Sequence, residues 1–230
     1  MSINTMRHNP IFYNASFTED IAVVGVGGLG SEVVRGLVKL GCGEKNKILV
    51  FDHDVVEPHN IANQAYDTRH LGMKKVSALA SLAREWSGVT LHEHPVAIEG
   101  PYALSGVVFV CVDSMAARKI IWESCIKRNQ KISLMVETRI EATSAFIHAV
   151  DPNNETHIKK WGQYWYPDAE AINGAGCGGH IAVGPTVSAA ASFALWQFIR
   201  HVAIRRGEKD VMDNQIQMKL RPFSVVAIQW

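Results

Sequence analysis

The sequence predicts an α/β protein in which helices cover both faces of a doubly wound, mostly parallel sheet that ends in antiparallel C-terminal strands. Two observations lead to this prediction. Apolar runs of strand length alternate along the chain with segments whose apolar residues recur at helical spacing. A glycine-rich turn, Gly25–Gly30, joins the first apolar run to the first helical segment. The chain has 230 residues, 47% of them hydrophobic, which is enough to bury one sizeable core.

The first fifty residues predict one strand–helix–strand unit. Ile21–Val24 is a short apolar run of the kind found in buried strands, and Lys47–Phe51 is a second. Between them, residues 31–40 carry one apolar face at helical spacing, formed by Val33, Val34, Leu37 and Val38. Two strands joined through a helix are expected to pair in parallel with a right-handed crossover.

The alternation continues to residue 150 and then stops. Helices are predicted over 75–86 and 116–128, and strands over 89–94, 106–112, 132–136 and 143–150, the last of which alternates as an antiparallel strand would. Residues 151–185 are rich in Pro, Asn, Gly and aromatic residues without a clear period, which predicts a long functional loop. A long apolar helix over 186–205 and two closing strands, 210–219 and 223–230, complete the pattern. We therefore expect a single domain over 1–230, with residues 1–20 as an N-terminal arm.

The overall composition argues against several classes of function. The chain carries 23 Lys and Arg against 22 Asp and Glu, a net charge of +1, so a polybasic nucleic-acid binder is not expected. No apolar run reaches about eighteen residues and the N-terminus lacks an apolar signal core, which predicts a soluble, cytoplasmic protein without a membrane span. The four cysteines form no C-x-x-C pair, so no zinc site is expected, and their number suits a reducing compartment.

The glycine turn predicts a nucleotide site. Its pattern is G-x-G-x-x-G, placed after a strand and at the start of a helix, with glycines at Gly25, Gly27, Gly28 and Gly30. Glycines let the backbone approach a phosphate, and the helix N-terminus supplies amide donors. Asp52 ends the second strand 22 residues after Gly30, where an acid would accept hydrogen bonds from ribose hydroxyls. The alternative is a packing turn with a surface aspartate, and these features alone do not separate NAD from ATP.

The next segments resemble a known superfamily. Asp52–Gln64 resembles the D-x-D-x-V-x-x-S-N-L-x-R-Q signature of the ubiquitin-activating-enzyme superfamily, which includes the ThiF, MoeB and HesA proteins. Gly72–Lys75 resembles its G-x-x-K, and Val112–Ser114 with Arg118 resembles its strand-end D-x-x-D-N and later arginine. The loop ending in Gly176–Gly179, before Gly184 and Pro185, resembles its crossover loop. This resemblance covers the chain from about Ile21 to Val202 and implies a Rossmann-like fold.

The resemblance implies ATP-dependent adenylation of the C-terminal carboxylate of a ubiquitin-like or sulfur-carrier protein. It implies a role for each matching residue: Gly25, Gly27, Gly28 and Gly30 would cradle the nucleotide, Asp52 would hold the ribose beside Asp54, Asn60 and Gln64 would line the phosphate site, Lys75 would neutralise phosphate charge, and Asp113 would hold Mg²⁺. Phosphoryl-type transfer depends on positioning and charge neutralisation, which agrees with this set. It further implies a homodimer and a carrier with a flexible C-terminal tail, followed in some systems by a conjugating enzyme.

The chain departs from the superfamily pattern at several positions. Asn63 stands where relatives carry an arginine, so Arg69, or Arg7 from a neighbouring subunit, is the candidate replacement. Ser114 replaces an asparagine, and the zinc-binding cysteine pairs of many members are absent. Arg118 is expected to form a salt bridge rather than to act on substrate.

Two features of the long loop have both functional and structural interpretations. Cys177 lies among glycines, three residues before His180, and is the candidate nucleophile for a thioester or persulfide, or a small loop residue. The loop's aromatic residues either clamp a partner's tail or pack the loop on the core: Trp161, Tyr164, Trp165 and Tyr166.

Three other functions remain as alternatives. The protein would be an adenylating dehydratase acting on a small-molecule or tRNA-attached carboxylate, a catalytically inactive nucleotide-binding scaffold of the same superfamily, or an NAD-dependent oxidoreductase. The last lacks support, because no Tyr-x-x-x-Lys or similar hydride-transfer set is present.

Overall fold

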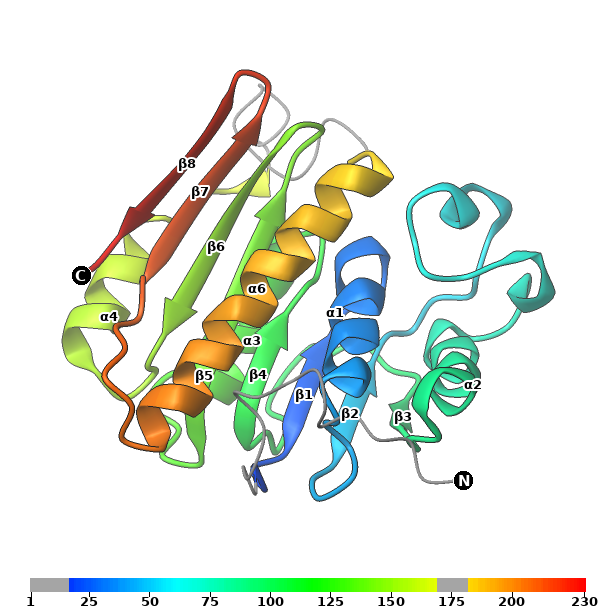
Figure 1. Ribbon diagram of the computed structural model, residues 1–230, viewed down its shortest axis with the longest axis horizontal. Coiled ribbons are helices and arrows are strands. Elements are labelled where there is room, and N and C mark those ends of the chain that lie inside the picture. Colours follow the sequence, from blue (N-terminus) through cyan, green and yellow to red (C-terminus); the bar gives the residue numbers. More distant parts are fainter. Residues whose placement is uncertain (1–16, 169–181) are drawn as a thin grey trace.

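The computed structural model describes residues 17–168 and 182–230. They form an eight-stranded sheet in the order β3-β2-β1-β4-β5-β6-β7-β8 (Figure 1). Neighbouring strands from β3 to β5 pair in parallel, and those from β5 to β8 pair antiparallel. The strand bounds are β1 (Ile21–Val24), β2 (Ile48–Phe51), β3 (His92–His94), β4 (Gly106–Val110), β5 (Ile132–Ile140), β6 (Ser144–Val150), β7 (Gln215–Leu220) and β8 (Phe223–Ile228). The predicted fold class is confirmed.

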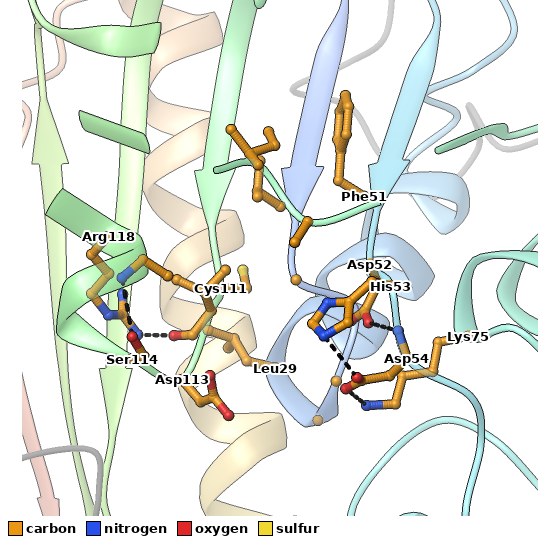
Figure 2. A pocket seen from close by; sticks show the side chains of 18 of the residues that line it. Leu29, Phe51, Asp52, His53, Asp54, Lys75, Cys111, Asp113, Ser114 and Arg118 are labelled. Carbon is orange, nitrogen blue, oxygen red and sulfur yellow. Dashed lines mark hydrogen bonds and ion pairs between the residues drawn. The ribbon is translucent and has the colours of Figure 1, made fainter. Parts of the chain in front are cut away.

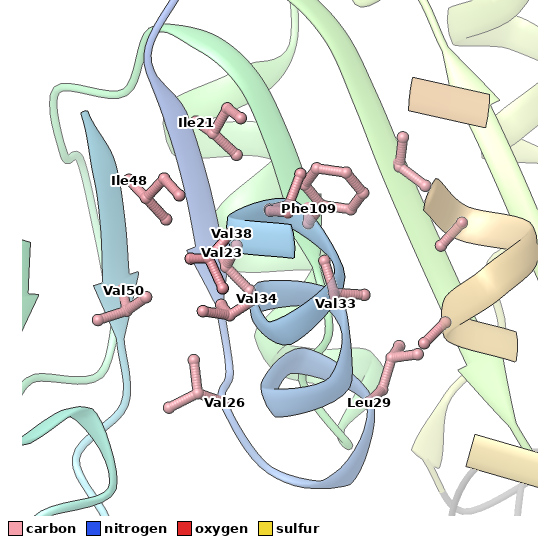
Figure 3. Packing of buried hydrophobic residues seen from close by; sticks show 14 of the residues in the cluster. Ile21, Val23, Val26, Leu29, Val33, Val34, Val38, Ile48, Val50 and Phe109 are labelled. Carbon is pink, nitrogen blue, oxygen red and sulfur yellow. The ribbon is translucent and has the colours of Figure 1, made fainter. Parts of the chain in front are cut away.

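Helices cover both faces of the sheet. On one face lie α1 (Gly28–Lys39), α2 (Lys75–Ser87) and α6 (Gly184–Arg205), and on the other lie α3 (Met115–Ile121) and α4 (Glu155–Gly162). Successive strand residues point to opposite faces, so Val23 packs with the first group of helices and Val24 with the second. Figure 3 shows Val33, Val34 and Val38 of α1 lying against β1 and its neighbours.

The ends of the central strands place the site. In the parallel register Val24 of β1 pairs with Phe51 of β2 and with Val110 of β4, so these three strands end together. From β1 the chain continues to β2 and β3 on one side, and then crosses to β4 on the other. In open α/β sheets this reversal leaves a crevice at the carboxyl ends of the strands, where ligands bind.

The structure corrects several predicted boundaries. Residues 151–185 are not wholly irregular, because α4 forms there, with Asn154 Oδ1 accepting from the Thr156 amide at 2.9 Å and the His157 amide at 3.4 Å. Strand β5 extends past residue 136 through three buried polar residues, two of which, Glu137 and Arg139, pair with each other. The helix predicted to reach 128 ends at Ile121 and continues as a π-helical turn, Trp122–Ile126. Strands β3 and β7 begin later than predicted, at His92 and Gln215. Two short 3₁₀ helices, Pro58–Ala62 and Thr68–His70, follow β2.

Helix α6 has an apolar composition for a structural reason. Within the described part of the chain it is the one helix whose length and mean hydropathy match a membrane span, although polar residues interrupt its apolar sequence. In the fold it packs against α1 and β5, and half of its apolar window is buried. Ala190, Ala194 and Phe198 belong to the core on that side of the sheet.

Candidate functional site

A pocket of about 550 Å³ lies at the carboxyl ends of the central strands (Figure 2). Most of the predicted nucleotide set lines it: Gly25, Gly27, Gly28, Asp52, Asp54, Gln64, Lys75 and Asp113. Figure 2 shows Asp52, Asp54 and Lys75 on one side of the pocket and Asp113, Ser114 and Arg118 on the other. The topology therefore brings together residues that are up to 88 positions apart in the chain, from Gly25 to Asp113.

The glycine turn combines a positive backbone angle with close approaches. Gly25 has φ +83°, and a Cβ there would lie 2.9 Å from the Cys111 carbonyl carbon. A Cβ on Gly30 would lie 1.9 Å from the Gly25 oxygen, so Gly30 permits packing of α1 against the turn, and it does not line the pocket. Gly27 is the N-cap of α1 and offers no side-chain cap, which leaves the first helical amides available to an anion.

Asp52 links β2 to the glycine turn. Its Oδ2 accepts a hydrogen bond from the Val26 amide at 2.9 Å, and its Oδ1 accepts from the Asp54 amide at 2.9 Å. Tyr66 supports the same turn by donating its hydroxyl to the Val26 carbonyl at 2.6 Å. The carboxylate is thus held in a fixed orientation at the pocket wall.

Lys75 enters the pocket as half of an ion pair. Its Nζ lies 2.8 Å from Asp54 Oδ2, and its side chain is 9% exposed. Burial would raise the pKa of Asp54, but the hydrogen bond and charge of Lys75 outweigh it and lower that pKa. The ammonium is therefore already partly neutralised by Asp54.

The opposite wall is organised by the start of α3. Ser114 Oγ accepts from the Ala117 amide at 3.0 Å and caps the helix, and Asp168 accepts from the Met115 amide at 2.6 Å. Arg118 donates to the Val112 carbonyl and lies 2.5 Å from Glu137 Oε1, which confirms the predicted salt bridge. Asp113 lies between these fixed groups and remains exposed.

A buried ion cluster behind this wall was not predicted. Glu137 of β5 is fully buried and contacts Arg118, Arg139 Nε at 2.8 Å and His148 Nδ1 at 2.7 Å. Burial would raise the pKa of Glu137, but the two arginines and His148 bring it well below its usual range. Trp161 Nε1 adds a hydrogen bond at 3.4 Å. The only sequence signal was a set of polar residues, 137–139, directly after an apolar run.

Besides Gly30, two further predicted residues do not line the pocket. Asn60 is buried and caps the 3₁₀ helix that begins at Pro58, its Oδ1 accepting from the Glu57 amide at 2.9 Å. Arg69 is exposed, and its Nη2 lies 2.7 Å from Asp67 and 3.6 Å from Glu85. The expectation that Arg69 substitutes for the missing arginine is therefore not met by this geometry.

Asn63, which stands where relatives carry an arginine, makes a structural hydrogen bond. Its Nδ2 donates to the Ala182 carbonyl at 3.0 Å, which ties the segment after β2 to the start of α6. Arg7 and Cys177 lie outside the described residues.

Cys111 lines the pocket, although its apolar run predicted only a core position. Burial raises the pKa of its thiol to about 12, and the same holds for Cys42. Neither thiol is poised as a nucleophile.

The described loop aromatics pack inward: Trp161 lies 4.6 Å from Trp122 between ring centroids, and Tyr164 stacks on Trp230.

Metal-ligating side chains gather at one place in the described part of the chain. Ligand atoms of Asp52, His53 and Asp54 lie within 4.8 Å of one another at the end of β2. None of the described cysteines, Cys42, Cys111 and Cys125, belongs to such a group.

Comparison with known proteins identifies the family. A family model described as "ThiF family" matches residues 13–228. The chain belongs to the ThiF family. Adenylyltransferase and sulfurtransferase MOCS3 of Mus musculus is 30% identical over 135 residues, covering 56% of this chain and 29% of the mouse protein. Ubiquitin-like modifier-activating enzyme 5 of Caenorhabditis briggsae is 29% identical over 151 residues, covering 57% of this chain and 34% of the nematode protein. This ThiF-family chain thus spans about a third of the length of these relatives.

Solved structures share the ThiF-family fold. E. coli MccB crystallised with ATP superposes with a TM-score of 0.68 at 15% identity, covering 95% of this chain and 64% of MccB. PaaA superposes with a TM-score of 0.66 at 18% identity, covering 91% of this chain and 63% of PaaA. At these identities the likeness shows the fold alone.

Proposed function

We propose that this ThiF-family protein is an ATP-dependent adenylyltransferase that activates the C-terminal carboxylate of a ubiquitin-like or sulfur-carrier protein. The observation that carries the proposal is the convergence of the glycine turn, Asp52, the Lys75–Asp54 pair and Asp113 on one pocket. The names of the MOCS3 and modifier-activating relatives support the same chemistry.

The pocket has the donors and acceptors that a nucleotide requires. Gly27 and Gly28 expose backbone at the uncapped start of α1, where phosphate oxygens would accept amide hydrogen bonds. Gln64 Oε1 is buried and has no hydrogen-bond partner among the described residues, so a ligand donor would satisfy it. Asp113, exposed at the end of β4, would hold Mg²⁺, an ion that takes carboxylate and phosphate oxygens as ligands and offsets their charge.

The chain's own residues act mainly by position and charge. An oxygen of the substrate carboxylate attacks the α-phosphorus, the bond to the bridging oxygen breaks, and pyrophosphate leaves with that electron pair. Asp52 orients the ribose, the α1 amides hold the phosphates, and Lys75 stabilises charge that develops on them. No residue has to form a covalent bond for this step.

A second substrate class has specific support. MccB structures of this fold include one with AMPCPP and MccA and one with N-formylated MccA. A peptide or small-molecule carboxylate would undergo the same adenylation here. An inactive scaffold would instead bind ATP without exchange, a possibility that Asn63 keeps open.

The decisive experiment is ATP–pyrophosphate exchange with the purified protein. Labelled pyrophosphate should enter ATP only when a cognate carrier protein or peptide is present. Calorimetry should show binding of ATP with Mg²⁺ in preference to NAD. Tight NAD binding without ATP binding would remove the adenylation proposal, and ATP binding without exchange for any carboxylate would favour the scaffold.

Three further assignments are proposals of the same kind. The protein acts in the cytoplasm as a homodimer, and the activated carrier passes to Cys177 or to a conjugating enzyme. Cys177→Ala should leave exchange intact and abolish a reductant-sensitive carrier adduct, because adenylation itself requires no thiol. An adduct that persists in Cys177→Ala would rule out this cysteine.

A further inference from the structure

Thr138 places an unpartnered hydroxyl in the pocket. It lies on β5, is 1% exposed and lines the pocket, and its Oγ1 has no hydrogen-bond partner among the described residues. Its neighbours Glu137 and Arg139 point to the opposite face of the strand, into the buried ion cluster. A buried hydroxyl without a partner is uncommon, because its desolvation is not compensated. A pocket ligand that reaches Oγ1 would supply the partner that this hydroxyl lacks.

The strand order assigns this part of the pocket to the substrate rather than to the nucleoside. The pocket crosses the ends of β2, β1, β4 and β5 in that order. Asp52 follows β2, the glycine turn follows β1, and Asp113 follows β4. Adjacent strands are about 4.8 Å apart, so Thr138 lies roughly three strand spacings beyond the proposed ribose acid. A carboxylate that approaches the α-phosphate from this side avoids both the nucleoside and the turn.

Two other donors that line this side of the pocket are already engaged: Asn63 Nδ2 donates to the Ala182 carbonyl at 3.0 Å, and Arg118 is paired with Glu137. The other pocket residues on this side include Ile140, Ala182 and Val187, whose side chains are apolar. A carboxylate entering an apolar region requires at least one hydrogen-bond donor. A neutral hydroxyl orients the carboxylate without the strong stabilisation that an arginine would give to the unreacted anion, so the carboxylate keeps its nucleophilicity.

We propose that Thr138 Oγ1 donates a hydrogen bond to the substrate carboxylate and positions it for attack on the α-phosphate. The proposal rests on the adenylation function and adds to it a substrate-binding residue on β5. After transfer, the same hydroxyl donates to the acyl carbonyl oxygen of the adenylate. Because Thr138 lies about three strand spacings from Asp52, loss of its hydroxyl should affect acyl ligands selectively.

Calorimetry with two probes tests the proposal. One probe is ATP with Mg²⁺, and the other is 5′-O-(N-glycylsulfamoyl)adenosine, a stable analogue of an acyl adenylate. Thr138→Val, which keeps the shape of the side chain, should weaken binding of the sulfamate about tenfold and leave ATP affinity within about twofold, as expected for one lost hydrogen bond. Thr138→Ser should restore sulfamate binding.

A matched control separates contact from folding. Thr186 is also fully buried, but its hydroxyl donates to the Ala142 carbonyl at 2.8 Å and it does not line the pocket. Thr186→Val should lower the melting temperature without changing the ratio of the two affinities. Equal affinity of Thr138→Val and wild type for the sulfamate, or an equal loss for both probes, would overturn the role of Thr138. A wild-type protein that binds neither probe would instead refute the adenylation function itself.

Discussion

At the scale of single residues, the charged groups of the pocket differ in how far they are already engaged. Lys75 is paired with Asp54, and Arg118 is paired with Glu137, each at a distance of 2.8 Å or less. Asp113 is exposed at the pocket wall. The exposed carboxylate is therefore the group best placed to take a cation together with the phosphates.

Replacing Asp113 should separate catalysis from folding. Asp113→Ala removes a charge at the surface of the pocket and leaves the packed core unchanged, so the melting temperature should stay near that of wild type. Pyrophosphate exchange should fall by about 10²-fold or more, the scale of a lost electrostatic contact in a transition state. Exchange at the wild-type rate in this variant would contradict the assignment.

Glu137 should be essential to stability. Glu137→Gln removes the negative charge that Arg118 and Arg139 share, while both guanidiniums stay buried. Breaking a buried pair in this way costs about 3–5 kcal/mol, which urea unfolding would measure. The control is Glu155→Gln, which affects an exposed pair with Arg128 and should hardly move the unfolding midpoint. A small effect at Glu137 would mean that the cluster relaxes when it loses its acid.

His148 should contribute to acid sensitivity. Burial lowers the pKa of His148, although Glu137 acts to raise it. His148 of the folded protein therefore takes up a proton only at a lower pH than His148 of the unfolded chain, which is protonated near pH 6.5. The unfolded state then binds more protons, and stability falls as the pH drops below about 6.5. Replacing His148 with Gln, which retains a donor for Glu137, should reduce this slope in unfolding measurements between about pH 7 and 5. An unchanged slope would assign the effect to the other histidines with lowered pKa values: His94, His157 and His201.

At the scale of elements, structure that depends on local interactions could be predicted from the sequence, whereas structure that depends on contacts between distant segments could not. The sequence predicts β1 and β2 to within one residue, and α1 with a start three residues too late, because their periodicity and turn chemistry are local. The extension of β5 through Glu137 was missed, because its burial depends on Arg118 and His148 from other elements. Asn60 was placed in the pocket by resemblance, yet its side chain is used to cap a local turn.

Gly30 gives a direct test of the turn. Gly30→Ala places a Cβ 1.9 Å from the Gly25 oxygen, a backbone atom that cannot move without displacing the turn. Overpacking of this kind costs about 1–3 kcal/mol, and calorimetry should also show weaker ATP binding. Gly100→Ala is the control, because a Cβ there meets nothing within 4 Å. Equal stability of the two variants would mean that α1 shifts freely, contrary to its packing against α6.

At the scale of the whole molecule, the sheet order explains why distant motifs share one pocket. The pocket combines the glycine turn, Asp52, Lys75 and Asp113, which are far apart in the sequence. Each of them follows or faces the end of a central strand. The motif spacing predicted this convergence. The side of the pocket lined by β5 and α6 was not predicted, because Thr138 and Ile140 of β5, Ala182 before α6 and Val187 within it form no motif and meet only in the fold.

The charge balance of the pocket leads to a prediction about assembly. Among the described pocket residues, the permanent cations are Lys75 and Arg118, both already paired with acids, while Asn63 and Arg69 are held by other contacts. A triphosphate site would therefore gain from an arginine supplied by another part of the assembly, and the superfamily resemblance indicates Arg7 of the partner subunit.

Arg7→Ala alone and Asp113→Ala alone should each be nearly inactive in pyrophosphate exchange. In an equal mixture, random pairing into two-fold dimers gives half heterodimers with one intact site each, so activity should return to about a quarter of wild type. The mixture must be refolded or co-expressed so that subunits exchange. Recovery would establish a shared site, whereas an inactive mixture that contains heterodimers would place any role of Arg7 within its own subunit.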